Sequence, residues 1–175
     1  ASGYDTGGAM IVVNKEGEAW SAKEVWRTKT NVMRAKFASP LRVGDHVYGL
    51  NEGYLECVDL KDGKRKWKDD RRGFRPGQAY GHGQILLAGQ HLIALTEYGE
   101  LTLVEAISEE MREVGRVRAL SGKCWNNHTI HQTRTVAASA VVGDFRCFVQ
   151  RTTQPVTHQF PNHSVAVLFG VLLAS

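Results

Sequence analysis

The sequence predicts an all-β fold made of repeated antiparallel sheets, and three observations carry this prediction. The stretch from Asp45 to Lys68 holds two runs of alternating strand character around a tight turn at Asn51-Glu52-Gly53, then a second turn and a third strand. The same template recurs from His91 to Ala106. Eighteen glycines against four prolines are typical of a chain with many short strands and many turns.

The spacing of the recurrence defines the repeat. Matching positions lie 45 residues apart before the tight turn and 46 residues apart after it. The matched pairs are His46 with His91, Leu50 with Leu95, Gly53 with Gly99, Leu55 with Leu101, Val58 with Val104 and Asp59 with Glu105. A strand-based repeat of this length is typical of stacked or radially arranged sheets. We therefore expect the function to depend on an array of sheets and not on one pocket.

The chain begins in the middle of a repeat unit. Residues 9–28 predict two strands joined at Asn14-Lys15-Glu16-Gly17, with Trp26 standing where Trp67 stands in the next unit. Residues 38–70 form the first complete unit, and an arginine- and glycine-rich loop follows it.

The second complete unit covers residues 81–120. Within it the acidic segment Ile107 to Met111 predicts a helical turn, and residues 113–120 alternate as the last strand. Residues 122–130 open another unit, so the repeats occupy residues 1–130. Residues 131–175 carry no recognisable repeat landmark, which leaves two alternatives: a divergent terminal unit, or a sequence produced by a frameshift.

Composition limits the class of protein. The 175 residues have a net charge of +4, so a nucleic-acid partner is not indicated. The basic run from Lys61 to Arg75 contains three aspartates and is typical of a solvated face. Three widely spaced cysteines do not suggest a disulfide framework. The apolar run Val165 to Ala174 is too short to cross a bilayer as a helix, so we expect no transmembrane segment.

A family resemblance rests on Val58-Asp59-Leu60, Gly63-Lys64 and Trp67. Together they resemble the quinoprotein-type (PQQ-like) β-propeller repeat, and the order of landmarks from residue 9 to residue 130 resembles secreted bacterial propellers of the outer-membrane-assembly-lipoprotein-like or polyvinyl-alcohol-dehydrogenase-like kind. The resemblance implies a partial β-propeller and a periplasmic or secreted location. Because a propeller closes with roughly four to eight blades, we expect a portion of a larger propeller or an open arc.

The leading hypothesis is a non-catalytic scaffold or binding module that meets a protein partner or a small ligand through its loops or its channel face. The alternative is a fragment of a PQQ-dependent quinoprotein oxidoreductase, which would use PQQ, calcium, a catalytic aspartate and, in alcohol-oxidising relatives, adjacent cysteines. No adjacent cysteines occur, and Asp59 is replaced by Glu105 in the next unit. We therefore assign no catalytic residue and no cofactor ligand.

The candidate ligand contacts lie just before the first strand of a unit, which lines the central channel in propellers. They are His82, Gln84, Asn126, Asn127 and His128. The competing interpretation, which we favour, is that these side chains satisfy turn backbone groups.

The remaining polar and aromatic landmarks are expected to be structural. Repeat positions are assigned to Trp26, Asp59, Gly63 and Trp67. Cys124, His128 and His131 have a spacing that metal sites use, but without a fourth ligand they predict no metal site.

Overall fold

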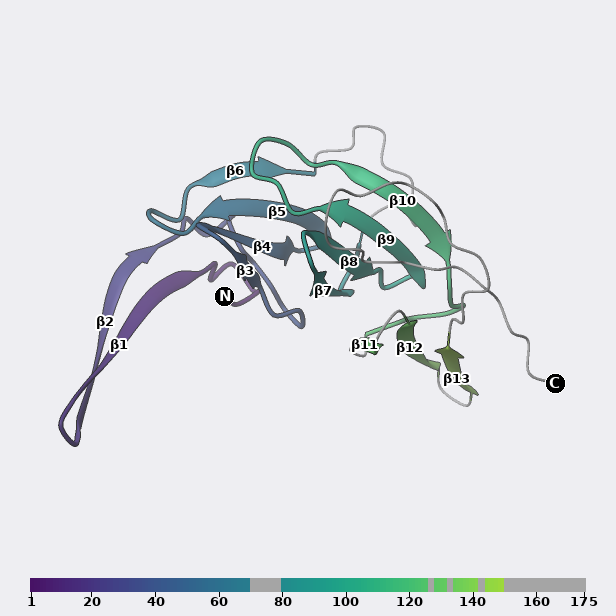
Figure 1. Cartoon of the computed structure of the whole chain (residues 1–175), viewed down its shortest axis with the longest axis horizontal. Helices are drawn as coiled ribbons and strands as arrows, with labels where there is room; N and C mark the ends of the chain where they lie inside the picture. Colours follow the sequence, from purple (N-terminus) through teal and green to yellow (C-terminus); the bar gives the residue numbers. More distant parts are fainter. Residues whose placement is uncertain (70–79, 126–127, 132–133, 142–143, 150–175) are drawn as a thin grey trace.

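The computed structural model describes residues 1–69, 80–125, 128–131, 134–141 and 144–149, with side chains for 1–69, 80–125 and 128. Within these residues the chain is all-β and forms four antiparallel sheets. The sheets follow one another along an arc, with β6 and β10 toward its outer side (Figure 1). The fold is a partial β-propeller, and the predicted fold class is confirmed.

The first complete blade contains β3 (Leu41–Val43), β4 (His46–Asn51), β5 (Tyr54–Asp59) and β6 (Arg65–Lys68), paired in that order. Asn51 pairs with Tyr54, and the two residues between them, Glu52 and Gly53, have φ values of 47° and 93°. Positive φ at both central positions defines the two-residue hairpin turn that suits the twist of the flanking strands. The tight turn predicted here is therefore present.

The second complete blade contains β7 (Gln84–Ala88), β8 (His91–Leu95), β9 (Glu100–Glu105) and β10 (Glu113–Arg118), again paired in sequence order. Its β8–β9 loop has one residue more than the equivalent turn of the first blade, and the Thr96 amide closes it on the Glu100 carbonyl at 2.8 Å. This loop explains why the repeat offset changes from 45 to 46.

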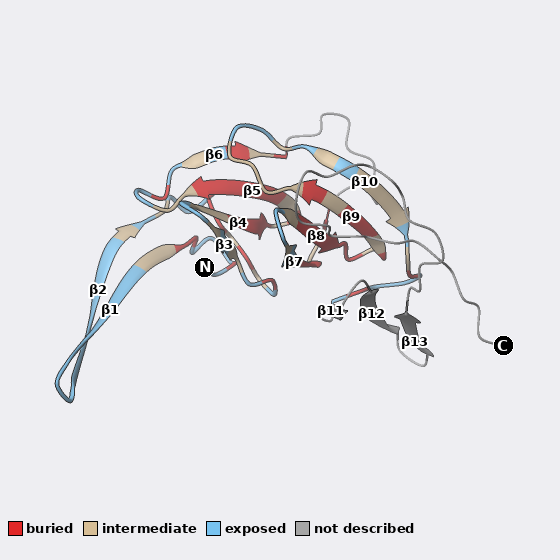
Figure 2. Cartoon of the chain, in the orientation of Figure 1, coloured by how far each residue is buried: buried red, intermediate tan, exposed pale blue. Residues whose placement is uncertain are grey.

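The two blades share one apolar core. β4, β5, β8 and β9 carry most of its buried residues (Figure 2). The contributing side chains are Ala38, Tyr48, Leu50, Leu55, Cys57 and Trp67 from the first unit and Tyr80, Ile85, Leu92, Ala94 and Val104 from the second. Neither blade covers its apolar face alone, so their packing against each other stabilises both.

The half-blade at the start of the chain is a long hairpin of β1 (Ala9–Glu16) and β2 (Ala19–Arg27). Its turn is Gly17-Glu18, because Glu16 pairs with Ala19. The sequence placed the turn earlier, from Asn14 to Gly17; that placement is wrong because the strand pairing continues through Asn14 and Lys15.

The helical turn predicted between Ile107 and Met111 is also wrong. These residues form an irregular connection between β9 and β10, closed where the Glu105 amide donates to the Arg112 carbonyl at 3.0 Å. The Ile107 carbonyl instead accepts the indole N–H of Trp67 from the first blade.

A fourth sheet follows the second blade. It consists of β11 (Thr129–His131), β12 (Arg134–Val141) and β13 (Asp144–Val149), paired in that order. Part of the segment without repeat landmarks is therefore strand, while residues 150–175 lie outside the described residues. In the part of the chain that is described, no helix is long and apolar enough to span a membrane.

Candidate binding site at the inner ends of the blades

The candidate site is formed by the segments that lead into the innermost strands. β3 and β7 are the innermost strands of the two blades, and Phe37 and His82 precede them at positions 45 residues apart. Trp125 follows the second blade and lies beside Phe37. We call Phe37, His82 and Trp125 the inner-edge cluster. The three rings come from segments far apart in sequence. They lie together because each segment stands at the inner end of a blade.

Phe37 contacts both other rings of the inner-edge cluster, and the cluster is at least partly open to solvent. His82 meets Phe37 edge to face, with 5.4 Å between ring centroids. Trp125 lies 6.4 Å from Phe37 with its ring tilted by 33°. Phe37 is 57% exposed and Trp125 49% exposed. Aromatic rings that remain half exposed while held by neighbours offer a large apolar surface to a partner.

Gln84 holds two members of the cluster from below. The side chain is buried, and its amide nitrogen donates to the carbonyls of Phe37 at 3.1 Å and Trp125 at 3.2 Å. One carboxamide therefore joins the segments before β3 and after β10 to the start of β7. This hydrogen bonding is consistent with the favoured interpretation of Gln84, since it satisfies backbone groups, and it also fixes the aromatic cluster.

Glu97 supports the third member. Its buried carboxylate accepts the His82 amide at 3.0 Å and lies 3.9 Å from the ammonium of Lys123. The Glu97 carbonyl accepts the Cys124 amide at 2.8 Å. Glu97 therefore ties the segment before β7 to the segment that carries Trp125.

The glycines of Gly81-His82-Gly83 are required by close packing. A Cβ on Gly83 would lie 2.0 Å from the Leu95 carbonyl oxygen. Gly81 has a φ of 56°, and a Cβ there would lie 2.6 Å from the Glu97 side chain. This motif lets the chain approach the β8–β9 loop closely and presents His82 beside Phe37.

Of the other predicted contacts, His128 does not join the cluster. Its side chain is 4% exposed, its Nε2 lies 3.2 Å from the Ile93 carbonyl, and its Nδ1 has no hydrogen-bond partner within the described part of the chain. Burial lowers the pKa of His128 to about 4, so the ring is neutral near pH 7 and donates from Nε2. Asn126 and Asn127 lie outside the described residues.

The four repeat-position residues make contacts within and between blades. Trp67 donates its indole N–H to the Ile107 carbonyl of the second blade at 2.9 Å, and Trp26 donates to the Leu60 carbonyl of the first blade at 2.8 Å. The Asp59 carboxylate accepts the Lys61 amide at 2.8 Å. Gly63, with a φ of 69°, lies against the Trp26 ring.

Two features of this region were missed at the sequence level. Phe37 was not singled out, although its offset of 45 from His82 was visible in the sequence. The second is a buried carboxylate, Glu56, which accepts the Met33 amide, the Asn51 amide group at 2.9 Å and the Arg65 guanidinium at 2.8 Å. No local pattern identifies it, because its partners lie on separate segments.

The two cysteines whose side chains the structure describes are not activated nucleophiles. Burial raises the pKa of the Cys57 thiol to about 11, and burial also raises the pKa of Cys124, so neither is a thiolate near pH 7. Calcium is held by six to eight oxygen ligands. Among residues 1–69, 80–125 and 128, no three His, Cys, Asp or Glu side chains converge as a metal site would require. These residues do not fit the calcium–PQQ centre that the quinoprotein resemblance implies.

The two cavities differ greatly in size. The space beneath the cluster, beside Gly53, Gly81 and His82, has a volume of about 10 Å³, whereas small-molecule sites have about 300–1,000 Å³. A wider groove of about 530 Å³ lies at the outer ends of the blades beside Trp67 and Met111. Its flanking carboxylates Glu110 and Glu113 are paired with Arg112 and Arg116.

Comparison with known proteins places the chain by its fold. No family model matches the sequence, and no curated protein matches it significantly. Among solved structures, the computationally designed Ika4 protein aligns with a TM-score of 0.50 and 11% identity over 74% of each chain.

Two natural proteins are also similar in structure. BamB from Moraxella catarrhalis aligns with a TM-score of 0.41 and 13% identity over 73% of this chain and 36% of that one. The WD40 domain of SCAP from fission yeast aligns with a TM-score of 0.40 and 9% identity over 82% and 44%. With such low identities these are likenesses of fold. The class that the fold defines is the β-propeller repeat protein.

Proposed function

We propose that this chain is a non-catalytic binding module that receives an extended segment of a protein partner on the inner-edge cluster. The observation that carries the proposal is the half-exposed pair Phe37 and Trp125, held in place from beneath by the buried side chain of Gln84. Preorganised aromatic side chains of this kind dominate the binding energy of protein interfaces.

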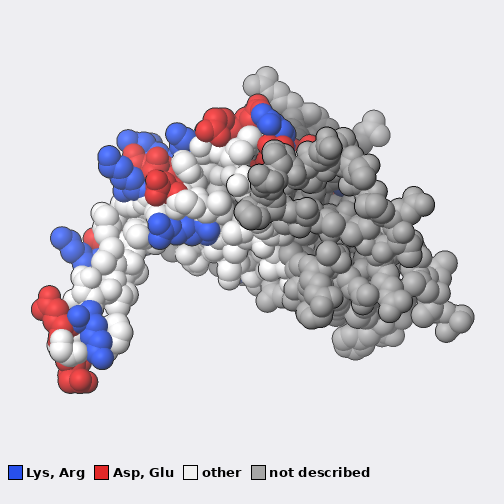
Figure 3. Space-filling view, in the orientation of Figure 1, with Lys and Arg blue, Asp and Glu red and all other residues white. Residues whose placement is uncertain are grey.

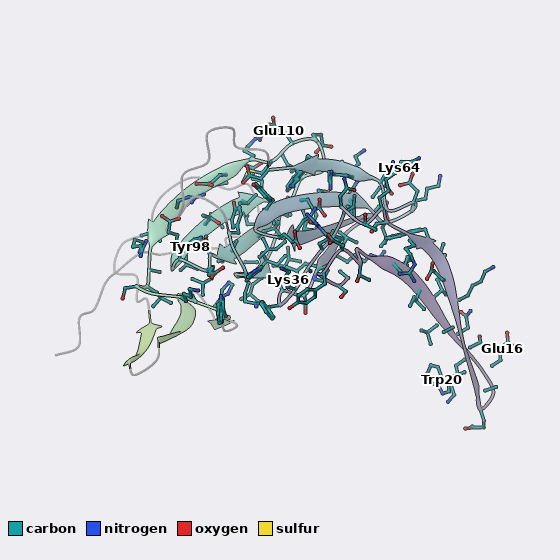
Figure 4. All side chains as sticks on the ribbon, turned by 180° about the vertical axis from the view of Figure 1, so that it is seen from behind. Glu16, Trp20, Lys36, Lys64, Tyr98 and Glu110 are labelled. Carbon is teal, nitrogen blue, oxygen red and sulfur yellow. The ribbon has the colours of Figure 1, made fainter. Side chains whose placement is uncertain are left out.

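A protein segment fits the surface better than a small molecule. The cluster is open, and the cavity beneath it is about the size of one water molecule, so a compact ligand would remain largely in solvent. An extended peptide can lie across Phe37, His82 and Trp125 and bury an apolar side chain among them. Lys36, which precedes Phe37 and is labelled in Figure 4, lines the same small cavity as Phe37 and His82.

The proposal includes the repeat class and the cellular location of the protein. The motif from Val58 to Trp67 supports a PQQ-like repeat. Because the order of landmarks resembles that of secreted bacterial propellers, we propose a periplasmic or secreted bacterial location.

The test is selection of short peptides from a random library on the wild-type chain, followed by affinity measurement on variants. We expect Trp125→Ser and Phe37→Ser each to weaken the selected peptides at least tenfold, since truncating a central aromatic residue of an interface costs about 2 kcal/mol or more. The matched control is Trp20→Ser, because Trp20 is 69% exposed but lies on the β1–β2 hairpin.

The proposal fails if the selected peptides bind Trp125→Ser and Phe37→Ser as tightly as wild type. A loss of affinity in the Trp20→Ser control alone would place the binding surface on the hairpin instead.

A further inference from the structure

Two lysines stand beside the exposed rings of the inner-edge cluster. The ammonium of Lys123 lies over the Trp125 ring, 5.1 Å from its centroid, and 66% of the Lys123 side chain is exposed. The ammonium of Lys36, next to Phe37 in the sequence, lies 5.0 Å from the centroid of the exposed Tyr4 ring. At these distances an ammonium group is attracted to the face of the ring. The chain therefore holds positive charge next to the apolar surface proposed for the partner.

The carboxylates near these lysines are already engaged with other groups. Glu52 makes its shorter ion pair with Arg34, at 2.9 Å, and lies 3.7 Å from the Lys36 ammonium. The buried carboxylate of Glu97 accepts a backbone amide at 3.0 Å and lies 3.9 Å from the Lys123 ammonium. Both lysine contacts are longer than a hydrogen bond. Among the described residues neither ammonium donates a hydrogen bond to a carboxylate, so both keep donors for a partner.

We propose that the inner-edge cluster recognises an acidic segment, in which an apolar side chain covers the exposed rings and neighbouring Asp or Glu carboxylates bind the ammonium groups of Lys36 and Lys123. This inference rests on the function proposed above and adds the charge of the partner. Hydrogen bonds between ammonium and carboxylate groups are shorter and stronger than neutral ones. An apolar side chain that displaces water from the rings also reduces the screening of the adjacent ion pairs. The apolar and the acidic residues of the ligand therefore strengthen each other's binding.

The charges of the chain favour an acidic over a basic partner. The net charge of +4 attracts an acidic segment and increases the rate of encounter. A basic segment would bring its own charge close to the ammonium groups of Lys36 and Lys123. The carboxylates that could attract it, Glu52 and Glu97, are each already bonded to an internal donor. The surface is therefore better suited to carboxylates than to ammonium groups.

The test uses the peptides selected from the random library on the wild-type chain. We expect Asp and Glu to be enriched at least twofold over the unselected library near the apolar residue that the peptides share. In the tightest peptide, replacing the acidic residues by Asn or Gln should weaken binding to the wild-type chain about fivefold, as expected for ion pairs that remain partly in solvent.

Variants of the two lysines identify the contact. On Lys123→Gln combined with Lys36→Gln, we expect the acidic peptide and its amide analogue to differ less than about twofold, because groups that interact show coupling in a double-mutant cycle. The matched control is Lys15→Gln. Lys15 also lies over an exposed indole, 5.4 Å from the centroid of Trp20. It belongs to the β1–β2 hairpin, where side chains of both signs stand close together at the tip (Figure 3), so its loss should leave the fivefold difference unchanged.

Circular dichroism reports whether each variant folds, and Lys123→Gln alone serves if Lys36→Gln does not fold. Selected peptides that require Phe37 and Trp125 but are not enriched in Asp and Glu overturn this inference and leave the function proposed above standing. So do peptides enriched in Lys and Arg, or a preference for acid that Lys15→Gln reduces as much as Lys123→Gln. Peptides that bind Phe37→Ser and Trp125→Ser as tightly as wild type overturn both proposals.

Discussion

Removing the Trp67 side chain tests whether the two blades stabilise each other. The indole is 8% exposed, its ring centroid lies 5.9 Å from that of Tyr48, and its N–H donates to the Ile107 carbonyl at 2.9 Å. The side chain therefore belongs to the first blade but makes its hydrogen bond to the second.

The expected magnitude follows from these contacts. Truncation of a buried tryptophan to alanine costs about 3–5 kcal/mol, and a small domain has about 5–15 kcal/mol in total. We therefore expect Trp67→Ala to lower the free energy of unfolding by about 4 kcal/mol. Trp67→Phe retains much of the ring but loses the hydrogen bond, so we expect it to cost about 1–2 kcal/mol.

The assay is urea unfolding followed by far-ultraviolet circular dichroism, because substitution of a tryptophan changes the fluorescence signal itself. Trp20→Ala is the control: the residue is 69% exposed, so at a protein concentration where the chain is monomeric its loss should change stability by no more than about 0.5 kcal/mol. If Trp67→Ala costs less than about 1 kcal/mol, or no more than the control, the tryptophan does not couple the blades and the reasoning is refuted.

Three further predictions follow from single sites. Burial lowers the pKa of His128 from 6.5 to about 4, so the unfolded chain binds the proton first as pH falls, and stability should drop by about 3 kcal/mol between pH 6.5 and pH 4; His128→Phe should remove most of that dependence in unfolding curves measured across this range. Gly83→Ala should destabilise the chain by about 2 kcal/mol or more because its Cβ would meet the Leu95 carbonyl, whereas Gly115→Ala, with open space around it, should be neutral or slightly stabilising in the same urea assay. If a frameshift produced the sequence after residue 130, the DNA around codon 130 should encode another repeat in a shifted frame; its absence from all frames would favour a divergent terminal unit.

The blades could be predicted from the sequence because their signals are local. Alternation along strands such as β4 and β8 is read from a few consecutive residues, and the turns are marked by glycine at positions that need positive φ, such as Gly53. The repeat then supplied the pairing order, since consecutive strands of each unit pair with each other.

The candidate site was predicted only in part because it depends on contacts between distant segments. Gln84 and His82 were identified from their place before a strand, but the Gln84 side chain bonds residues 47 and 41 positions away. No local pattern shows that Phe37 and Trp125 flank the same side chain. His128 was a candidate ligand contact, with hydrogen bonding to turn backbone groups as the favoured interpretation; its Nε2 lies 3.2 Å from the Ile93 carbonyl of β8, which its position next to a turn did not indicate.

The other surfaces of the blades explain why the candidate site lies at the inner ends. The broad faces of the blades pack against each other through residues such as Tyr48 and Leu92, and the groove of about 530 Å³ opens between the sheets at their outer ends. At the outer ends, Arg112 and Arg116 pair with carboxylates of their own blade, which leaves little unsatisfied charge for a partner there. At the inner ends the polar groups are satisfied beneath the surface, by Gln84 and Glu97, and aromatic rings remain above them. A partner that meets the inner ends gains apolar burial without breaking an internal hydrogen bond, which makes this the least costly surface of the described blades for a binding partner to cover.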